Sequence, residues 1–93
     1  MTAYAIVTLT LDDPDTFSRY RSLAGPAMAT HKAEPLAVSP EAQVIEGEGP
    51  APDVTVILTF PDRDHARAWI NDPEIAGVHA LRRASGTSRI ILM

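Results

Sequence analysis

Five side chains in this sequence could take part in chemistry at a ligand. His31 and Glu46 could move a proton, because imidazole and carboxylate groups serve as general acids and bases. Arg82 could hold an anionic group, and Tyr20 and Trp69 could form the wall of a pocket. Together these residue types indicate a site for a small organic ligand, with or without an anionic group.

Each of these residues also has a structural explanation. His31 and Arg82 fall where helices are expected to end, and the helix dipole favours positive charge there. Glu46 could form an ion pair with Arg82. Tyr20 and Trp69 could fill the core of a small domain without meeting any ligand. The residues alone leave both interpretations open.

The composition argues against several other chemistries. The absence of cysteine removes disulfides, thiolate nucleophiles and cysteine-bound metals. His31, His65 and His79 lack the close spacing that is typical of metal ligands on one element, so we expect neither a metal ion nor haem. No phosphate-binding loop and no nucleophile elbow is present. We therefore expect the site to need no cofactor.

Charge and hydropathy restrict the partners. The formal net charge is -4, whereas a nucleic-acid partner usually requires a basic face, so we expect no nucleic acid. The apolar runs are too short to span a bilayer, and we expect no membrane association. Residues 1–4 show neither the basic nor the apolar region of a signal peptide. A cytoplasmic location is the expectation that follows.

Alternating apolar residues predict four strands. Residues 4–11 and 54–60 are the clearest, because apolar side chains alternate there without glycine or proline. Residues 88–93 form the last predicted strand. Residues 34–39 and 43–46 are predicted to form an edge strand, in one or two pieces, because Pro35 and Pro40 cannot donate to a central ladder.

Helices are predicted between these strands. The first runs from Pro14 to about His31 with Asp13 as its N-cap, and Pro26 should kink it or break it near Gly25. A second helix covers residues 63–71, capped by an aspartate, and a further helical piece starts at residues 72–73 and stops at a glycine at position 86.

The order of these elements predicts one domain over residues 1–93. Strand, helix, strand, strand, helix, strand is the ferredoxin-like βαββαβ order of an α+β fold. Its antiparallel sheet carries the first and third strands in the centre and both helices on one face.

The second face of the sheet would then be uncovered and would carry threonine and apolar residues with no acidic residue or lysine in the two central strands. A face-to-face second copy would cover it, and the two sheets would close into one barrel. The alternative is a monomer with a threonine-rich open face. The residues of this face in the central strands are Tyr4, Ile6, Thr8, Thr10, Thr55, Ile57 and Thr59.

Residues spread along the whole chain carry a family resemblance. They are Tyr4, Asp13-Pro14, Tyr20, Pro26, Glu46-Gly47, Phe60-Pro61, Ala66, Trp69, Asp72-Pro73-Glu74 and Arg82. With these residues in this order, the chain resembles the bacterial domain-of-unknown-function family 1330 over nearly its full length. The resemblance implies a dimeric α/β barrel. The sequence departs from the family pattern at Lys32-Ala33-Glu34, where glycines are usual, and at Ile75, where a tyrosine is usual.

The resemblance leaves the activity open. Dimeric barrels of this kind include cofactor-free monooxygenases, isomerases, haem-degrading enzymes and binding modules, so the fold does not select a reaction. The favoured expectation is a homodimer that binds a small molecule in or beside the barrel without a cofactor. The alternatives are a non-catalytic structural module and a cofactor-independent monooxygenase or isomerase.

Overall fold

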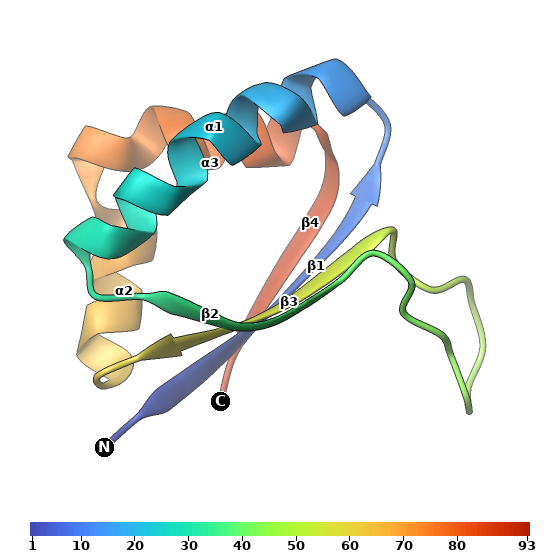
Figure 1. Cartoon of the computed structure of the whole chain (residues 1–93), viewed down its shortest axis with the longest axis horizontal. Coiled ribbons are helices and arrows are strands. Elements are labelled where there is room, and N and C mark those ends of the chain that lie inside the picture. Colours follow the sequence, from blue (N-terminus) through green and yellow to red (C-terminus); the bar gives the residue numbers. More distant parts are fainter.

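A four-stranded antiparallel sheet with helices on one face forms the protein, in a computed structural model that describes residues 1–93 (Figure 1). The strand order is β2-β3-β1-β4, which confirms the α+β ferredoxin-like prediction and places the first and third strands in the centre. Along the chain the elements are β1 (Ala3–Leu11), α1 (Pro14–Thr30), β2 (Glu34–Ser39), β3 (Val54–Phe60), α2 (Arg63–Asn71), the short 3₁₀ helix η1 (Pro73–Ile75), α3 (Ala76–Ala84) and β4 (Gly86–Leu92).

The helices begin where the sequence predicts. Asp13 accepts a hydrogen bond from the backbone N–H of Thr16 at 3.1 Å, and Asp62 accepts one from that of His65 at 2.8 Å. Each carboxylate thereby satisfies a donor that the first turn of a helix leaves free. The helical piece after residue 72 is divided into η1 and α3, and β4 begins at Gly86 rather than Ser88.

Two local expectations need correction. Of the kink or break expected at Pro26, the break near Gly25 does not occur, because helix α1 continues through Pro26 to Thr30, with Ala27 buried and Met28 packed against the core. Only the first of the two predicted pieces of β2 is a strand. Residues 43–46 are irregular, since Pro40 ends the pairing with β3 and nearly all of the following segment lies in solvent.

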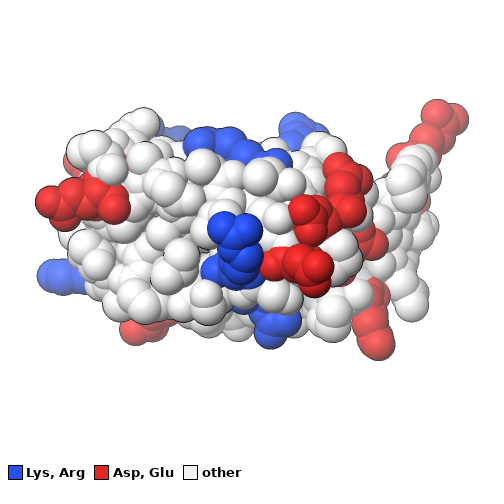
Figure 2. All heavy atoms as spheres, turned by 90° about the horizontal axis from the view of Figure 1, so that it is seen from above, with Lys and Arg blue, Asp and Glu red and all other residues white.

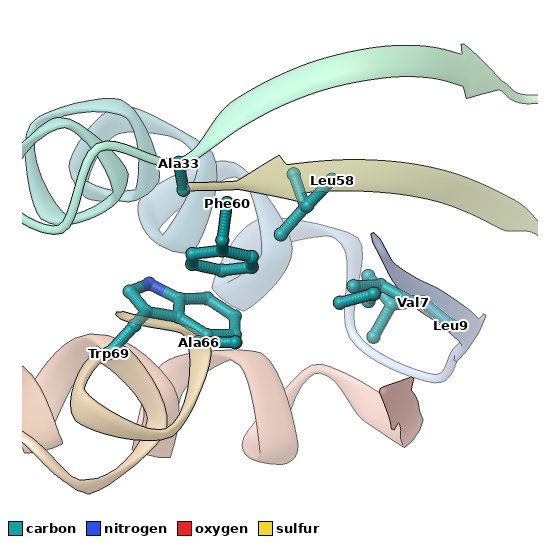
Figure 3. Packing of buried hydrophobic residues seen from close by; sticks show 8 residues of the cluster. Val7, Leu9, Ala33, Leu58, Phe60, Ala66 and Trp69 are labelled. Carbon is teal, nitrogen blue, oxygen red and sulfur yellow. The ribbon is translucent and has the colours of Figure 1, made fainter. Parts of the chain in front are cut away.

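The core lies between the helices and the inward face of the sheet. Ala5, Val7 and Leu9 of β1 alternate inward, as predicted, beside Leu58 and Phe60 of β3. The ring of Trp69 lies against that of Phe60 with 5.7 Å between the centroids (Figure 3). In Figure 1, α1 and α3 lie side by side over this face, and no element covers the opposite face.

Candidate functional site

Three of the predicted site residues meet beneath the helices. Arg82 projects from α3, Trp69 from α2 and Tyr20 from α1. The guanidinium carbon of Arg82 lies 5.5 Å from the centroid of the Trp69 ring and 5.8 Å from that of Tyr20. Both separations are within the range of cation–π attraction. The structure therefore brings Tyr20, Trp69 and Arg82 into one cluster.

Arg82 is a buried cation without a carboxylate partner. Its exposed fraction is 1%, and no acidic side chain lies within ion-pair distance. Its Nε donates to Ser88 Oγ at 3.1 Å, and its Nη1 donates to His79 Nδ1 at 2.7 Å. Burying a charge is costly, and these two hydrogen bonds with the two aromatic rings offset part of that cost.

His79 completes this cluster and is held as a neutral imidazole. Arginine can only donate, so His79 Nδ1 must be an acceptor, and Nε2–H donates to the backbone carbonyl of Trp69 at 2.8 Å. Burial lowers the pKa of His79, the bond to the Trp69 carbonyl opposes that shift, and the nearby Arg82 charge lowers the pKa further. The imidazole also meets the indole of Trp69 edge-on at 4.7 Å.

An apolar cavity of about 150 Å³ that opens to solvent adjoins this cluster, and Trp69 is one of its lining residues. The cavity is between α2 and the inward face of the sheet. Seven of its eight lining residues are hydrophobic; the lining consists of Ala5, Phe60, Ala66, Arg67, Trp69, Ile70, Ile90 and Leu92. Its mostly apolar lining with few polar groups is the composition that is typical of small-ligand pockets.

His31 lies away from that cavity. It follows the last turn of α1, and its Nε2 is 2.7 Å from Asp72 Oδ2, both side chains being 15% exposed. Asp72 also accepts from the backbone N–H of Glu74, where η1 begins. The bond to His31, and next the bond from Glu74, hold the pKa of Asp72 below its usual range. The pair ties the end of α1 to the start of η1.

Glu46 is remote from the other predicted site residues. It is exposed in the segment between β2 and β3, which Figure 1 shows projecting away from the sheet at the end opposite α2. No ion pair joins Glu46 to Arg82 within the chain. The structure thus separates Glu46 from the other predicted site residues, and His31 bonds to Asp72 rather than lining the cavity.

Sequence reasoning missed two residues of this region. His79 lies three residues before Arg82, and this spacing places both side chains on one face of α3, which is the signal that could have paired them. Arg67 is the charged residue of the cavity lining, and nothing in its spacing distinguishes it from other exposed arginines.

No three His, Asp or Glu side chains gather as metal ligands would, and no helix is long and apolar enough to cross a membrane.

The class of fold is clear from comparison with solved structures. A protein of unknown function from Rhodopseudomonas palustris is 17% identical, with a TM-score of 0.77 over 99% of this chain and 80% of that one. A dimeric ferredoxin-like protein of unknown function from Jannaschia sp. CCS1 is 12% identical, with a TM-score of 0.74 over 100% and 98% of the two chains. This protein therefore has the ferredoxin-like fold.

The family follows from the sequence itself. Residues 2–93 match the family described as "Domain of unknown function (DUF1330)", and the chain belongs to that family, as the resemblance predicts. A search of curated proteins gave no match. The cofactor-independent oxygenase SnoaB from Streptomyces nogalater is 14% identical, with a TM-score of 0.62 over 99% of this chain and 89% of that one. At such identity the likeness concerns the fold alone.

Proposed function

We propose that this protein binds a small organic molecule in the apolar cavity between α2 and the sheet, and that it does so as a homodimer. The cavity carries the proposal, because it is a hollow of about 150 Å³ that opens to solvent and is lined almost wholly by hydrophobic side chains. An apolar cavity of this size can take a single aromatic ring. The non-catalytic structural module is the alternative that a negative binding experiment would favour.

In this proposal Arg82, His79 and Tyr20 position the wall of the cavity. His79 holds the backbone carbonyl of Trp69, and Arg82 holds His79 while lying over the indole ring. Two donor groups of Arg82 are therefore already engaged within the protein. Trp69 is the one predicted site residue that lines the cavity itself. His31 and Glu46 do not line it, so we assign them no step in the proposed function.

The uncovered face of the sheet supports the homodimer. Cross-strand pairing places Ile6 of β1 between Ile57 of β3 and Ile91 of β4, which makes an apolar row across the sheet. Ile91 is 47% exposed, and Tyr4, two residues before Ile6 on the same face of β1, is 39% exposed. On the helix-bearing side, by contrast, Figure 2 shows charges of both signs scattered over the surface. A second copy would cover the apolar row and leave the cavity, on the other face, accessible.

Toluene is a suitable first probe of the cavity, because it has one ring and no charge. Its binding can be read from the fluorescence of Trp69, the only tryptophan in the chain. Substituting the buried Ala66→Leu fills part of the cavity, and we expect toluene affinity to fall about tenfold through lost apolar contact. Ala68→Leu, exposed on the same helix, is the matched control and should bind toluene normally.

Circular dichroism should show that both leucine variants fold. If toluene leaves the fluorescence unchanged, or if both variants bind it equally, the cavity is not a ligand site and the proposal fails.

A further inference from the structure

The segment between β2 and β3 exposes apolar side chains that its own fold does not bury. Residues 40–53 contain neither helix nor strand, and Figure 1 shows them projecting beyond the end of the sheet and away from the helices. We call this segment the arm. On it, Ile45 is 94% exposed and the adjacent Val44 is 45% exposed. Such a pair gains nothing from burial within its own chain, so it can contribute to stability only through contact with another molecule.

The arm is acidic as well as apolar. Residues 33–62 contain neither lysine nor arginine, and no carboxylate of the arm forms an ion pair within the chain. The arms of two copies would therefore repel each other if they met. A surface that suits the arm should instead offer apolar side chains beside a positive charge. The acidic residues of the arm are Glu41, Glu46, Glu48 and Asp53.

The opposite edge of the sheet offers such a surface. Arg89 and Ile91 of β4 pair with Thr8 and Ile6 of β1, so both lie on the uncovered face of the sheet. Ile91 is 47% exposed, and Met93, just after β4, is 65% exposed. Arg89 is also exposed and forms no ion pair within the chain. One edge of the uncovered face thus carries exposed apolar side chains next to an unpaired cation.

The arm cannot reach this edge in its own chain. It leaves the sheet between β2 and β3, whereas β4 is the edge strand on the other side, three strand spacings from β2 and thus about 14 Å away. A two-fold rotation that stacks two sheets face to face can place one edge of a sheet over the opposite edge of its partner. The arm would then meet the partner's β4, and the same contact would occur twice.

We propose that in the homodimer each arm lies against the partner's β4, with Val44 and Ile45 on the partner's Ile91 and Glu46 beside the partner's Arg89. This inference rests on the proposed function, because it requires the homodimer. Adjacent residues of the arm supply the apolar contact and the ion pair, which matches the spacing of Ile91 and Arg89 on one face of β4. Glu46 thereby has a role in assembly rather than in chemistry.

Cross-linking tests the contact directly, because the chain contains no cysteine of its own. We expect the double variant Ile45→Cys with Ile91→Cys, treated with a short bismaleimide, to give a covalent dimer on a denaturing gel. Each single variant should remain a monomer on the gel. The matched control is Leu23→Cys with Ile91→Cys, which moves the first cysteine to an exposed position on α1 and should not cross-link.

Exchanging the two charges tests the ion pair. Glu46→Lys and Arg89→Glu each bring like charges together at two places in the dimer, so we expect each to weaken dimer affinity about fivefold. The variant with both substitutions should recover most of the wild-type affinity. Glu74→Lys, exposed on η1, makes the same change of charge elsewhere and should leave the affinity unchanged. Sedimentation velocity over a range of concentrations measures all four variants.

The outcomes separate this inference from the proposed homodimer. If the wild type is a dimer but the double-cysteine variant cross-links no more than its control, or the exchanged charges restore nothing, the inference is wrong and the homodimer stands. Ile45→Cys alone cross-linking as fully as the double variant would show that the arms meet each other, which also overturns the inference. If the wild type sediments as a monomer at every concentration, the inference and the homodimer fail together.

Discussion

At the scale of single residues, the cluster around Arg82 depends on the charge state of His79. A protonated His79 could not accept the hydrogen bond from Arg82 Nη1, and it would add a second positive charge beside a buried guanidinium. Burial accordingly lowers the pKa of this imidazole in the folded protein. The other ring nitrogen of His79 donates to the carbonyl of Trp69. Protonation of His79 would therefore affect both the wall of the cavity and the stability of the fold.

The stability of the protein should therefore decrease as the pH falls through the range below the ordinary histidine pKa of about 6.5. The unfolded chain takes up a proton at His79 there, and the folded chain takes it up only at lower pH because its pKa is lowered. Urea unfolding at pH 7.5 and 5.5 would measure the loss, which cannot exceed about 1.4 kcal/mol per pH unit for one group. His79→Gln cannot titrate, and it should lose clearly less stability over this interval. An equal loss in both proteins would contradict this role for His79.

Gly86 is a second residue with a specific steric role. A Cβ atom built there would lie 1.9 Å from the backbone oxygen of Thr10, because β4 begins close against the end of β1. We expect Gly86→Ala to lower the free energy of unfolding by about 1–3 kcal/mol through overpacking against backbone that cannot turn away. Gly77→Ala is the control. Its added methyl meets nothing within 4 Å, and in α3 it should stabilise the protein by up to about 1 kcal/mol.

At the scale of elements, the end of α1 explains one departure from the family pattern. The N–H of Ala33 bonds to the carbonyl of Met28, and that of Lys32 bonds to the carbonyl of Ala29, which together form a Schellman motif. In this motif the residue after the C-cap adopts a left-handed conformation, and Lys32 has a φ of 57°. Glycine adopts that conformation without strain, so a glycine at this position, as the family resemblance implies, would fit the backbone better than Lys32 does.

Replacing Lys32→Gly should stabilise the protein by about 1 kcal/mol, because a side chain with a Cβ pays for the left-handed conformation at this position. Lys32→Ala removes the same charge and keeps the Cβ, so it should give little or no gain. Thermal unfolding followed by circular dichroism compares the three proteins. A gain in the alanine variant as large as in the glycine variant would mean that the lysine charge, rather than the backbone, is unfavourable here.

Elements with local signals could be predicted from the sequence, and contacts between elements could not. The bounds of β3 and the caps Asp13 and Asp62 follow from alternation and from helix-start chemistry, which act within a few residues. The meeting of Tyr20 and Arg82 under two helices depends on how α1 and α3 pack. Residues 43–46 were predicted to form part of the edge strand and do not, because the pairing of β2 with β3 ends at Ser39 and leaves them no partner strand.

The candidate site shows this division most clearly. Trp69 and Arg82 were predicted from their residue types, and the structure brings them together. The cavity is formed by side chains from β1, β3, α2 and β4, and the burial of the Trp69 Nε1–H arises only when these elements pack. The place of Arg67 in the cavity lining could not be predicted from the sequence, because most of the residues that line the cavity with it are distant along the chain.

At the scale of the whole molecule, the two faces of the sheet have different environments. The inward face is covered by the helices, and the outward face presents the row of Ile6, Ile57 and Ile91 between rows of threonine and other residues. A chain of 93 residues buries a limited fraction of its surface, so covering this row would contribute substantially to its stability. A two-fold related copy would bring the same row against this one, so that apolar side chains would meet apolar side chains across the interface.

The substitution Ile57→Lys tests that association. It places a charge at the centre of the row, and in a two-fold interface each substitution occurs twice, so we expect dimer affinity to fall at least about 100-fold. Sedimentation velocity over a range of concentrations should show the wild type as a dimer and the variant as a monomer. Ala80→Lys, exposed on α3, adds the same charge away from the sheet and should remain dimeric. Because the cavity lies on the other face, a folded Ile57→Lys monomer should still bind toluene, which separates the two parts of the proposed function. A wild type that sediments as a monomer at every concentration would show instead that the outward face is compatible with water.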